Sequence, residues 1–209
     1  PVDDVRLGTV GVAVSGVEVK LGEHNEIIMR GGSMFKGYYK NDEATASTLK
    51  DGWLHTGDVG EWRDGQLKIV DRLKDIMITA GGKNLSPTEI ENTIKASPYI
   101  KECIVIGEAR KYVSALIQID FDTVAKWAEQ ERIAYTTFRS LTEQPQVNEL
   151  IQAEVNKGNE QLPQVAQIKR FSLLTKELDH DDDEVTATMK VRRSKIYEKY
   201  TEVIESLYA

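Results

Sequence analysis

The residues with the clearest chemical potential are two charged side chains on either side of a predicted hairpin. Asp58 directly follows Gly57, so its carboxylate could approach a sugar closely and accept hydrogen bonds from two ribose hydroxyl groups. Arg72 comes after the hairpin and offers a planar fork of donors to hydroxyl or phosphate oxygens. The ordinary alternative is that Asp58 is a turn residue and Arg72 a solvated surface charge. The residues alone leave both interpretations open.

A second candidate is the glycine-rich segment Gly81-Gly82-Lys83-Asn84, which leads into a helix start. A Walker phosphate loop requires glycine five positions before Gly82 and serine or threonine after Lys83, but these places hold Met77 and Asn84. We therefore interpret the segment as a tight turn whose missing side chains let a thin ligand pass along the backbone. The alternative is an ordinary pair of loop glycines before a helix.

The elements that position Asp58 and Arg72 are predicted to be strands. Short β-branched runs bounded by turn residues make residues 1–71 β-rich, and Asp64-Gly65 predicts a two-residue hairpin turn. A short helix is expected from Asn41 to Lys50. This part is too small to close a full core, so we expect it to rest on something else. Before the hairpin, the strands are expected over residues 8–12, 17–20 and 26–30.

From Lys74 onward the pattern changes to α+β. Ser86, Pro87 and Glu89 have the spacing of a helix start, with a cap, a first-turn proline and an acidic third position. The acidic run over 179–184 lacks the spacing and the glycine of a calcium loop, so we interpret it as a solvated, mobile loop. Strands are expected over 76–78, 104–107, 113–119 and 167–174, and helices over 87–97, from a cap at Asp122 to 132, after Pro145, and over 191–207.

Composition indicates a globular chain and excludes several classes of protein. Of the 209 residues, 40% are hydrophobic and 29% charged, and the net charge of −7 argues against a general nucleic-acid surface. No apolar run approaches the length of a membrane span. Cys103 is the only cysteine, so the chain has no internal disulfide, which fits a reducing cytoplasm. We predict Cys103 to be a buried strand residue, because Ile104-Val105-Ile106 follow it. The three histidines are too scattered to suggest a metal site, and none is expected.

Three blocks of the sequence resemble the acyl-CoA synthetases, within the superfamily of adenylate-forming enzymes. The first block is similar to the stretch that leads to the ribose-binding residue of the family, and it comprises Gly-Tyr-Tyr-Lys-Asn-Asp-Glu-Ala-Thr (37–45) followed by Gly52–Asp58. Asp71–Asn84 resembles its hinge and glycine loop, and Thr186–Arg193 its C-terminal block with the catalytic lysine. The blocks lie in family order and cover nearly the whole chain.

The resemblance implies a role for each candidate residue. Asp58 and Arg72 would bind the nucleotide through its ribose, and Lys74 would be the hinge, although many relatives carry Asp there. Gly81, Gly82 and Lys83 would line the path of the pantetheine arm of coenzyme A. Lys190 would be catalytic, with its ammonium bridging the substrate carboxylate and the ATP α-phosphate. Without the resemblance, a lysine beside Arg192 and Arg193 is usually part of a solvated face.

The resemblance also implies a fold, a division of the chain and a reaction. Residues 1–72 would end the large adenylation core, and 73–209 would form the C-terminal lid, a small mixed sheet with packed helices. The substrates would be a fatty acid, ATP and coenzyme A, with Mg²⁺ bound mainly by an N-terminal portion. We expect a C-terminal fragment that is inactive alone, in the cytoplasm, with a peripheral membrane contact left open.

Two features favour the long-chain fatty acid branch. The segment over 126–163 is longer than a compact lid needs, and Thr-Ala-Thr-Met precedes Lys190 where many relatives have glycine just before the lysine. The alternatives are an adenylate-forming enzyme of another branch, acting on aryl or short-chain acids or loading a carrier protein, and a non-catalytic interaction module with the lid fold.

Overall fold

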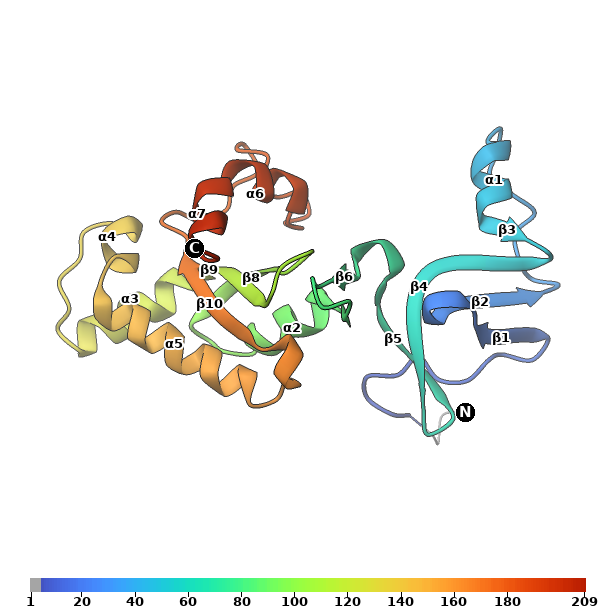
Figure 1. The fold of residues 1–209 in the computed structure, drawn as a ribbon, viewed down its shortest axis with the longest axis horizontal. Helices are drawn as coiled ribbons and strands as arrows, with labels where there is room; N and C mark the ends of the chain where they lie inside the picture. Colours follow the sequence, from blue (N-terminus) through green and yellow to red (C-terminus); the bar gives the residue numbers. More distant parts are fainter. Residues whose placement is uncertain (1–4) are drawn as a thin grey trace. The chain divides into compact units, whose positions relative to one another are not determined.

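The computed structural model of the protein describes residues 5–209, and the chain divides into two compact units. The first unit is Pro1–Ile76 and the second is Met77–Ala209 (Figure 1). Each unit builds its own sheets, and α-helices join small sheets in both, so the predicted α+β class is confirmed.

The first unit is built on an antiparallel sheet whose order is β1-β2-β4-β3, with β5 paired to β4. The turn between β4 and β5 is the predicted one, because Asp64 and Gly65 both have positive φ, 49° and 82°. Such torsion angles match the twist of a two-residue hairpin. The strands are β1 (Val17–Leu21), β2 (Glu26–Gly31), β3 (Leu49–Lys50), β4 (Trp53–Arg63) and β5 (Gln66–Arg72).

In this unit the sequence prediction was wrong at one strand, and it was right about the helix except at its end, where Leu49 and Lys50 form β3. No strand forms over 8–12, where Gly11 makes only an isolated bridge to Leu67. Gly8 and Gly11 adopt φ of 84° and 89°, which interrupt an extended run. Helix α1 (Asp42–Thr48) does form, and the Asn41 side chain caps it by accepting from the Ala44 amide at 3.0 Å.

The second unit is built on a three-stranded sheet in the order β10-β9-β8. Strands β8 (Ile100–Ile106) and β9 (Val113–Ile119) are antiparallel, whereas β10 (Ile168–Leu173) is parallel to β9. A separate two-stranded ribbon of β6 (Met77–Ile78) and β7 (Asn84–Leu85) precedes α2 (Pro87–Ile94). Ser86 caps α2 by accepting from the Glu89 amide at 3.0 Å, as predicted.

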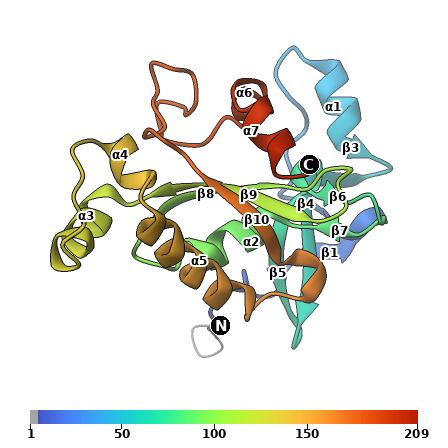
Figure 2. The ribbon, with the colours of Figure 1, turned by 60° about the vertical axis from the view of Figure 1, so that its left-hand side comes forward.

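Helices cover both faces of this sheet. Cys103 and Val105 of β8 pack in a core with α2, α3 (Phe121–Gln130) and α5 (Pro145–Asn159), and Cys103 is buried as predicted. Ile104 and Ile106 point the other way and pack against α6 (Arg193–Lys199) and α7 (Thr201–Ser206). Figures 1 and 2 show α2 and α5 on one side of the strands and α6 and α7 on the other. This double cover explains why β9 is buried along its whole length.

The helices of this unit differ from the prediction in three ways. Asp120 caps α3, accepting from the Thr123 amide at 3.1 Å, whereas the predicted cap Asp122 lies in the first turn. A short helix α4 (Phe138–Thr142) was not predicted. The expected helix over 191–207 is two helices, because Tyr200 leaves helical torsion angles (φ −106°, ψ 21°) and ends α6.

Candidate functional site

Asp58 and Arg72 form an ion pair on neighbouring strands. They are register partners on β4 and β5, and Arg72 Nε lies 3.0 Å from Asp58 Oδ1. The Asp58 side chain is 28% exposed and that of Arg72 58%, so both can meet a ligand. The structure therefore brings together the two residues that the sequence analysis assigned to ribose.

A carboxylate that the sequence analysis missed supports the part of β4 just before Asp58. Glu26 of β2 accepts from the Gly57 amide at 3.0 Å through one oxygen and lies 2.7 Å from His55 Nδ1 through the other. Thr56 accepts from the Asp58 amide at 3.1 Å. Gly57 has φ of 70°, a torsion angle that favours glycine. These contacts hold the backbone on both sides of Gly57, and no local motif in the sequence indicates them.

Lys74 lies in a single 3-10 turn, Leu73–Asp75, at the end of the first unit. Its side chain is exposed, and the turn is bridged by a hydrogen bond from the Ile76 amide to the Arg72 carbonyl at 3.1 Å. A short turn with an exposed central residue holds few contacts that would resist a change of torsion angles.

The glycine segment is a tight turn between β6 and β7. The Gly82 amide donates to the Thr79 carbonyl at 2.8 Å, and Thr79 Oγ1 accepts from the Lys83 amide at 3.2 Å. Gly82 has φ of 71°, while Gly81 does not have a positive φ. A Cβ added at Gly82 would meet nothing within 4 Å, so open space lies beside the backbone there.

This turn is hydrogen-bonded to the loop between β8 and β9. The Ala80 amide donates to the Arg110 carbonyl at 2.9 Å, and the Ala109 amide donates to the Ile78 carbonyl at 2.8 Å. The Glu108 carboxylate accepts from the Ile78 amide at 2.7 Å. The conformation of the glycine turn is therefore coupled to that of the β8–β9 loop.

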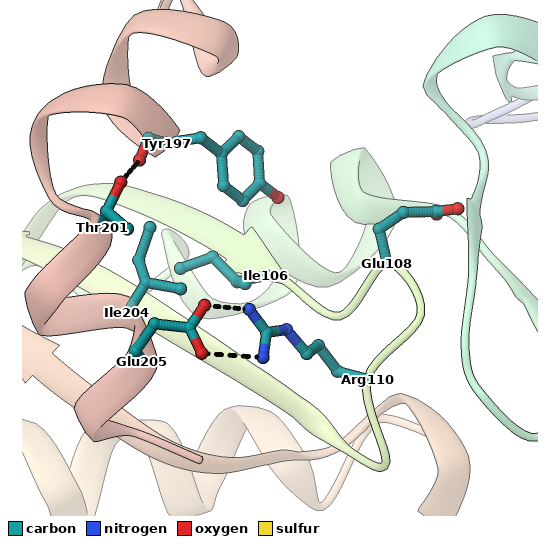
Figure 3. Close-up of a pocket in the computed structure, with 7 residues that line it drawn as sticks. All are labelled: Ile106, Glu108, Arg110, Tyr197, Thr201, Ile204 and Glu205. Atoms are coloured by element: carbon teal, nitrogen blue, oxygen red, sulfur yellow. Dashed lines mark hydrogen bonds and ion pairs between the residues drawn. The ribbon is translucent and has the colours of Figure 1, made fainter. Parts of the chain in front are cut away.

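The β8–β9 loop also borders a pocket of about 420 Å³ that the sequence analysis did not predict (Figure 3). Arg110 and Glu205 close one side of it with a bidentate ion pair, in which Arg110 Nη1 lies 3.0 Å from Glu205 Oε2. Figure 3 shows Tyr197 and Thr201 on the helical side and Glu108 on the loop side. The lining residues are Ile106, Glu108, Arg110, Tyr197, Thr201, Ile204 and Glu205.

Lys190 lies in a hairpin-like turn that precedes α6. Val185 and Val191 form an antiparallel bridge, and Thr186 closes the turn with hydrogen bonds to and from the Lys190 backbone at 2.8 and 3.1 Å. Met189 has φ of 60°. The Lys190 side chain is exposed, so the turn presents an ammonium group to solvent from a backbone that is locally fixed.

The acidic run before Lys190 is not a fully solvated loop, contrary to the sequence prediction. The Glu184 side chain is completely buried, between the ammonium groups of Lys176 and Lys199 at 2.8 and 2.9 Å. Tyr200 donates to it at 2.9 Å. Burial opposes ionisation of Glu184, but the hydrogen bonds from Lys176 and Lys199 outweigh that effect and lower its pKa. Burial and the bond to Glu184 raise the pKa of Tyr200 to about 12.

Arg193 is not on a solvated face either. Its guanidinium lies 2.6 Å from Glu91 of α2, and Glu91 also accepts from the Val105 amide at 2.8 Å. Burial raises the pKa of Glu91, and Arg193 partly counteracts that effect. Arg193 therefore links the start of α6 to α2 and β8.

The candidate residues are divided between the two units. Asp58, Arg72 and Lys74 belong to the first, and the glycine turn with Lys83 and the Lys190 turn belong to the second. Within residues 5–209, no three His, Cys, Asp or Glu side chains are grouped so that they could share a metal ion. No helix in that range has the length and apolar character needed to cross a membrane.

Comparisons of the sequence identify relatives. A profile described as the AMP-binding enzyme C-terminal domain matches residues 74–209. The putative fatty-acid–CoA ligase fadD11 of Mycobacterium tuberculosis is 43% identical over 209 residues, which cover 99% of this chain and 36% of that protein. Long chain acyl-CoA synthetase 1 of Arabidopsis thaliana is 33% identical over 226 residues, covering 100% of this chain and 34% of that protein. The chain spans about a third of the length of these curated relatives.

Comparisons of the structure agree with those of the sequence. The adenylation domain of a carboxylate reductase from Mycobacterium chelonae has a TM-score of 0.68 at 26% identity, over 88% of this chain and 27% of that one. The fold is shared with o-succinylbenzoate CoA synthetase from Bacillus subtilis, at a TM-score of 0.64 and 22% identity over 91% of this chain and 36% of that one. The profile match covers more than half of the chain, so the chain belongs to the AMP-binding enzyme family and contains its C-terminal domain, as the resemblance to acyl-CoA synthetases predicted.

Proposed function

We propose that the whole protein is an AMP-forming long-chain fatty acid–CoA ligase. In the first step the fatty acid carboxylate attacks the α-phosphorus of Mg·ATP, which gives acyl-adenylate and pyrophosphate. In the second step the thiol of coenzyme A attacks the acyl carbon, which gives the thioester and AMP and releases the thiol proton. The observation that carries this proposal is the 43% identity, over the whole chain, to a putative fatty-acid–CoA ligase.

Asp58 and Arg72 would bind the ribose. Their ion pair joins Nε of Arg72 to Oδ1 of Asp58, so the ribose would be bound by Oδ2 and the two terminal guanidinium nitrogens, which take no part in that contact. A carboxylate oxygen can accept from a ribose hydroxyl, and the guanidinium can donate to one. The Glu26 contacts to His55 and Gly57 support this role, since they fix the backbone next to Asp58.

Lys190 would serve the first step. Its ammonium would lie between the carboxylate and the α-phosphate, two anions that repel each other as they react, and would neutralise both. The exposed side chain on a hydrogen-bonded turn supports this role. Mg²⁺ enters as part of the Mg·ATP substrate.

Gly81, Gly82 and Lys83 would line the approach of coenzyme A in the second step. The open space beside Gly82 supports this role, because a pantetheine arm is thin and runs close to the backbone. Lys74 would be the hinge about which residues 73–209, as a lid, turn relative to an adenylation core that ends with residues 1–72. The partner of this chain would be the N-terminal portion of such a core, and the location the cytoplasm.

A second candidate is an adenylating enzyme that passes its acyl group to an acceptor other than coenzyme A. The observation in its favour is the likeness to the adenylation domain of a carboxylate reductase, at 26% identity and a TM-score of 0.68. In this case the first step and the roles of Asp58, Arg72 and Lys190 would be unchanged, and only the acceptor would differ.

The test uses the full-length protein with a panel of acetate, benzoate, decanoate and palmitate, with and without coenzyme A. We expect pyrophosphate release with the two fatty acids and formation of their thioesters only when coenzyme A is present. Pyrophosphate release without thioester would favour the second candidate. Absence of pyrophosphate with every acid would contradict both and favour a non-catalytic module. The 209-residue chain alone serves as control and should give no turnover above the buffer blank.

A further inference from the structure

The turn that carries Lys190 is joined at its base to a buried charge cluster. The Glu184 carbonyl accepts from the Arg192 amide at 2.8 Å, so Glu184 is the residue at which the turn closes. Its neighbour Val185 is 2% exposed and packs among the apolar residues beneath α6 and α7. The base of the turn therefore lies in the core, while Lys190 at the other end is exposed.

The Glu184 side chain connects this base to two other segments. One oxygen meets Lys199 and the Tyr200 hydroxyl, each at 2.9 Å, at the end of α6. The other oxygen meets Lys176 at 2.8 Å and the Asp179 amide at 3.0 Å, in the segment that follows β10. Asp182 lies outside this group, paired with Lys176 and 3.4 Å from Lys199. Every group that faces Glu184 in this cluster is a donor, which a carboxylate satisfies and an amide cannot.

We propose that Glu184 is a positioning residue for Lys190, and this inference rests on the proposed function of Lys190 in adenylate formation. The carboxylate fixes the base of the turn between the end of α6 and the segment after β10, and so sets where the Lys190 ammonium can reach. A buried carboxylate with four donors is rigid, because any shift leaves a buried charge without its partners. An ammonium that must lie between two reacting anions depends on such a support.

The substitution that tests this is Glu184→Gln in the full-length protein. Glutamine keeps the size but places an amide NH₂ against a lysine or a backbone amide, so at least one pair of donors face each other. Glu198→Gln is the matched control, since Glu198 lies on α6 and makes an exposed pair with Lys195 at 3.1 Å. We expect adenylate formation to fall roughly 10- to 100-fold in Glu184→Gln, by analogy with other small misplacements of reacting groups. Thioester formation from supplied acyl-adenylate should be unchanged in both variants.

A double mutant separates positioning from a general loss of structure. If Glu184 acts through Lys190, then Glu184→Gln added to Lys190→Ala should cause no further loss of adenylation rate. Additive losses, or equal losses in both half-reactions, would overturn the proposal. Lys199→Gln provides a second route should Glu184→Gln not fold, because the Lys199 side chain is 41% exposed and Glu184 keeps Lys176 as a partner. It should give the same pattern with a smaller loss.

Hydrogen exchange provides a readout that does not depend on activity. The amides of Thr186, Lys190 and Arg192 are hydrogen-bonded within the turn, and their exchange should accelerate in Glu184→Gln but not in Glu198→Gln. The amides of β8 and β9 should be unaffected in both. If the wild-type protein forms no adenylate, the proposed function fails, while the exchange data still decide whether Glu184 holds the turn. Unchanged exchange in Glu184→Gln would overturn the inference in either case.

Discussion

Arg72 Nε lies 3.0 Å from Asp58 Oδ1, because the two residues are register partners across β4 and β5. The hairpin at Asp64-Gly65 brings together two charges that are far apart in the sequence. A second ion pair, Glu61 with Lys68 at 3.0 Å, joins the same two strands. The hairpin thus contains a candidate nucleotide site and a second ion pair that can serve as its control.

The first prediction concerns the ribose. In the full-length protein, Asp58→Ala should raise KM for ATP roughly ten-fold, the effect of losing one hydrogen bond to a charged acceptor. It should also abolish the preference of the wild-type protein for ATP over 2′,3′-dideoxy-ATP, because the acceptor for the hydroxyl groups is gone. Steady-state kinetics with both nucleotides provide the measurement.

The control for that prediction is Glu61→Ala, which removes the other ion pair of the hairpin. Pairs as exposed as these contribute about 0–1 kcal/mol to stability, so neither variant should shift thermal unfolding by much. A change in KM without a change in unfolding would locate the effect in binding. If Glu61→Ala lost the same discrimination, Asp58 would not be the ribose residue.

The second prediction separates Lys190 from Gly82. Lys190→Ala should lower the rate of adenylate formation on the order of 10²–10³-fold, as expected for one lost charge–charge contact in the transition state. It should leave thioester formation from supplied acyl-adenylate nearly unchanged. Gly82→Leu should do the reverse, since its side chain would obstruct the approach of pantetheine. Single-turnover kinetics of each half-reaction provide the measurement.

Gly82→Ala is the matched control for backbone strain. Gly82 has φ of 71°, so alanine and leucine impose similar strain there, but only leucine adds bulk. The alanine variant should therefore keep most of the thioester-forming rate. Equal losses in the alanine and leucine variants would indicate strain, and a slow second step in Lys190→Ala would contradict the division of roles.

The third prediction concerns the hinge. Lys74→Pro restricts φ and removes an amide proton within the turn Leu73–Asp75, so it should hinder reorientation of the lid. The two half-reactions would need different lid positions, and one rate should fall much more than the other. Lys74→Ala leaves the backbone free and should lose far less in both. Equal losses of both rates in the proline variant would argue against a hinge at this position.

The fourth prediction concerns acid stability. The pKa of Glu184 is lower in the folded protein than its ordinary value of 4.5, so at acid pH the unfolded chain holds more protons at this residue. The stability from Glu184 is therefore complete above pH 4.5 and is lost as pH falls through the folded pKa. Below pH 4.5 the unfolding free energy of Glu184→Gln should fall less steeply than that of the wild type. Thermal unfolding at a series of pH values provides the measurement, and a slope equal to that of Glu198→Gln would refute the assignment.

Local signals in the sequence determined much of the fold. The hairpin at Asp64-Gly65, the cap at Ser86 and the strand β9 all depend on a few adjacent residues, and all were predicted correctly. The family was also predicted correctly from the sequence, because its motifs are short and lie in order along the chain. The prediction of a strand over 8–12 was wrong because it depended on glycines, whose torsion angles are decided by the surrounding structure and not by adjacent residues.

Only the tertiary structure decided how charged residues are used. By sequence the run over 179–184 is a solvated acidic loop, yet Glu184 is completely buried because Lys176 and Lys199 meet it from two other segments. Tyr200 donates to the same carboxylate where α6 ends, and the expected single helix becomes two. A carboxylate is stable in the core only when donors from distant parts of the chain surround it, and no local pattern records that arrangement.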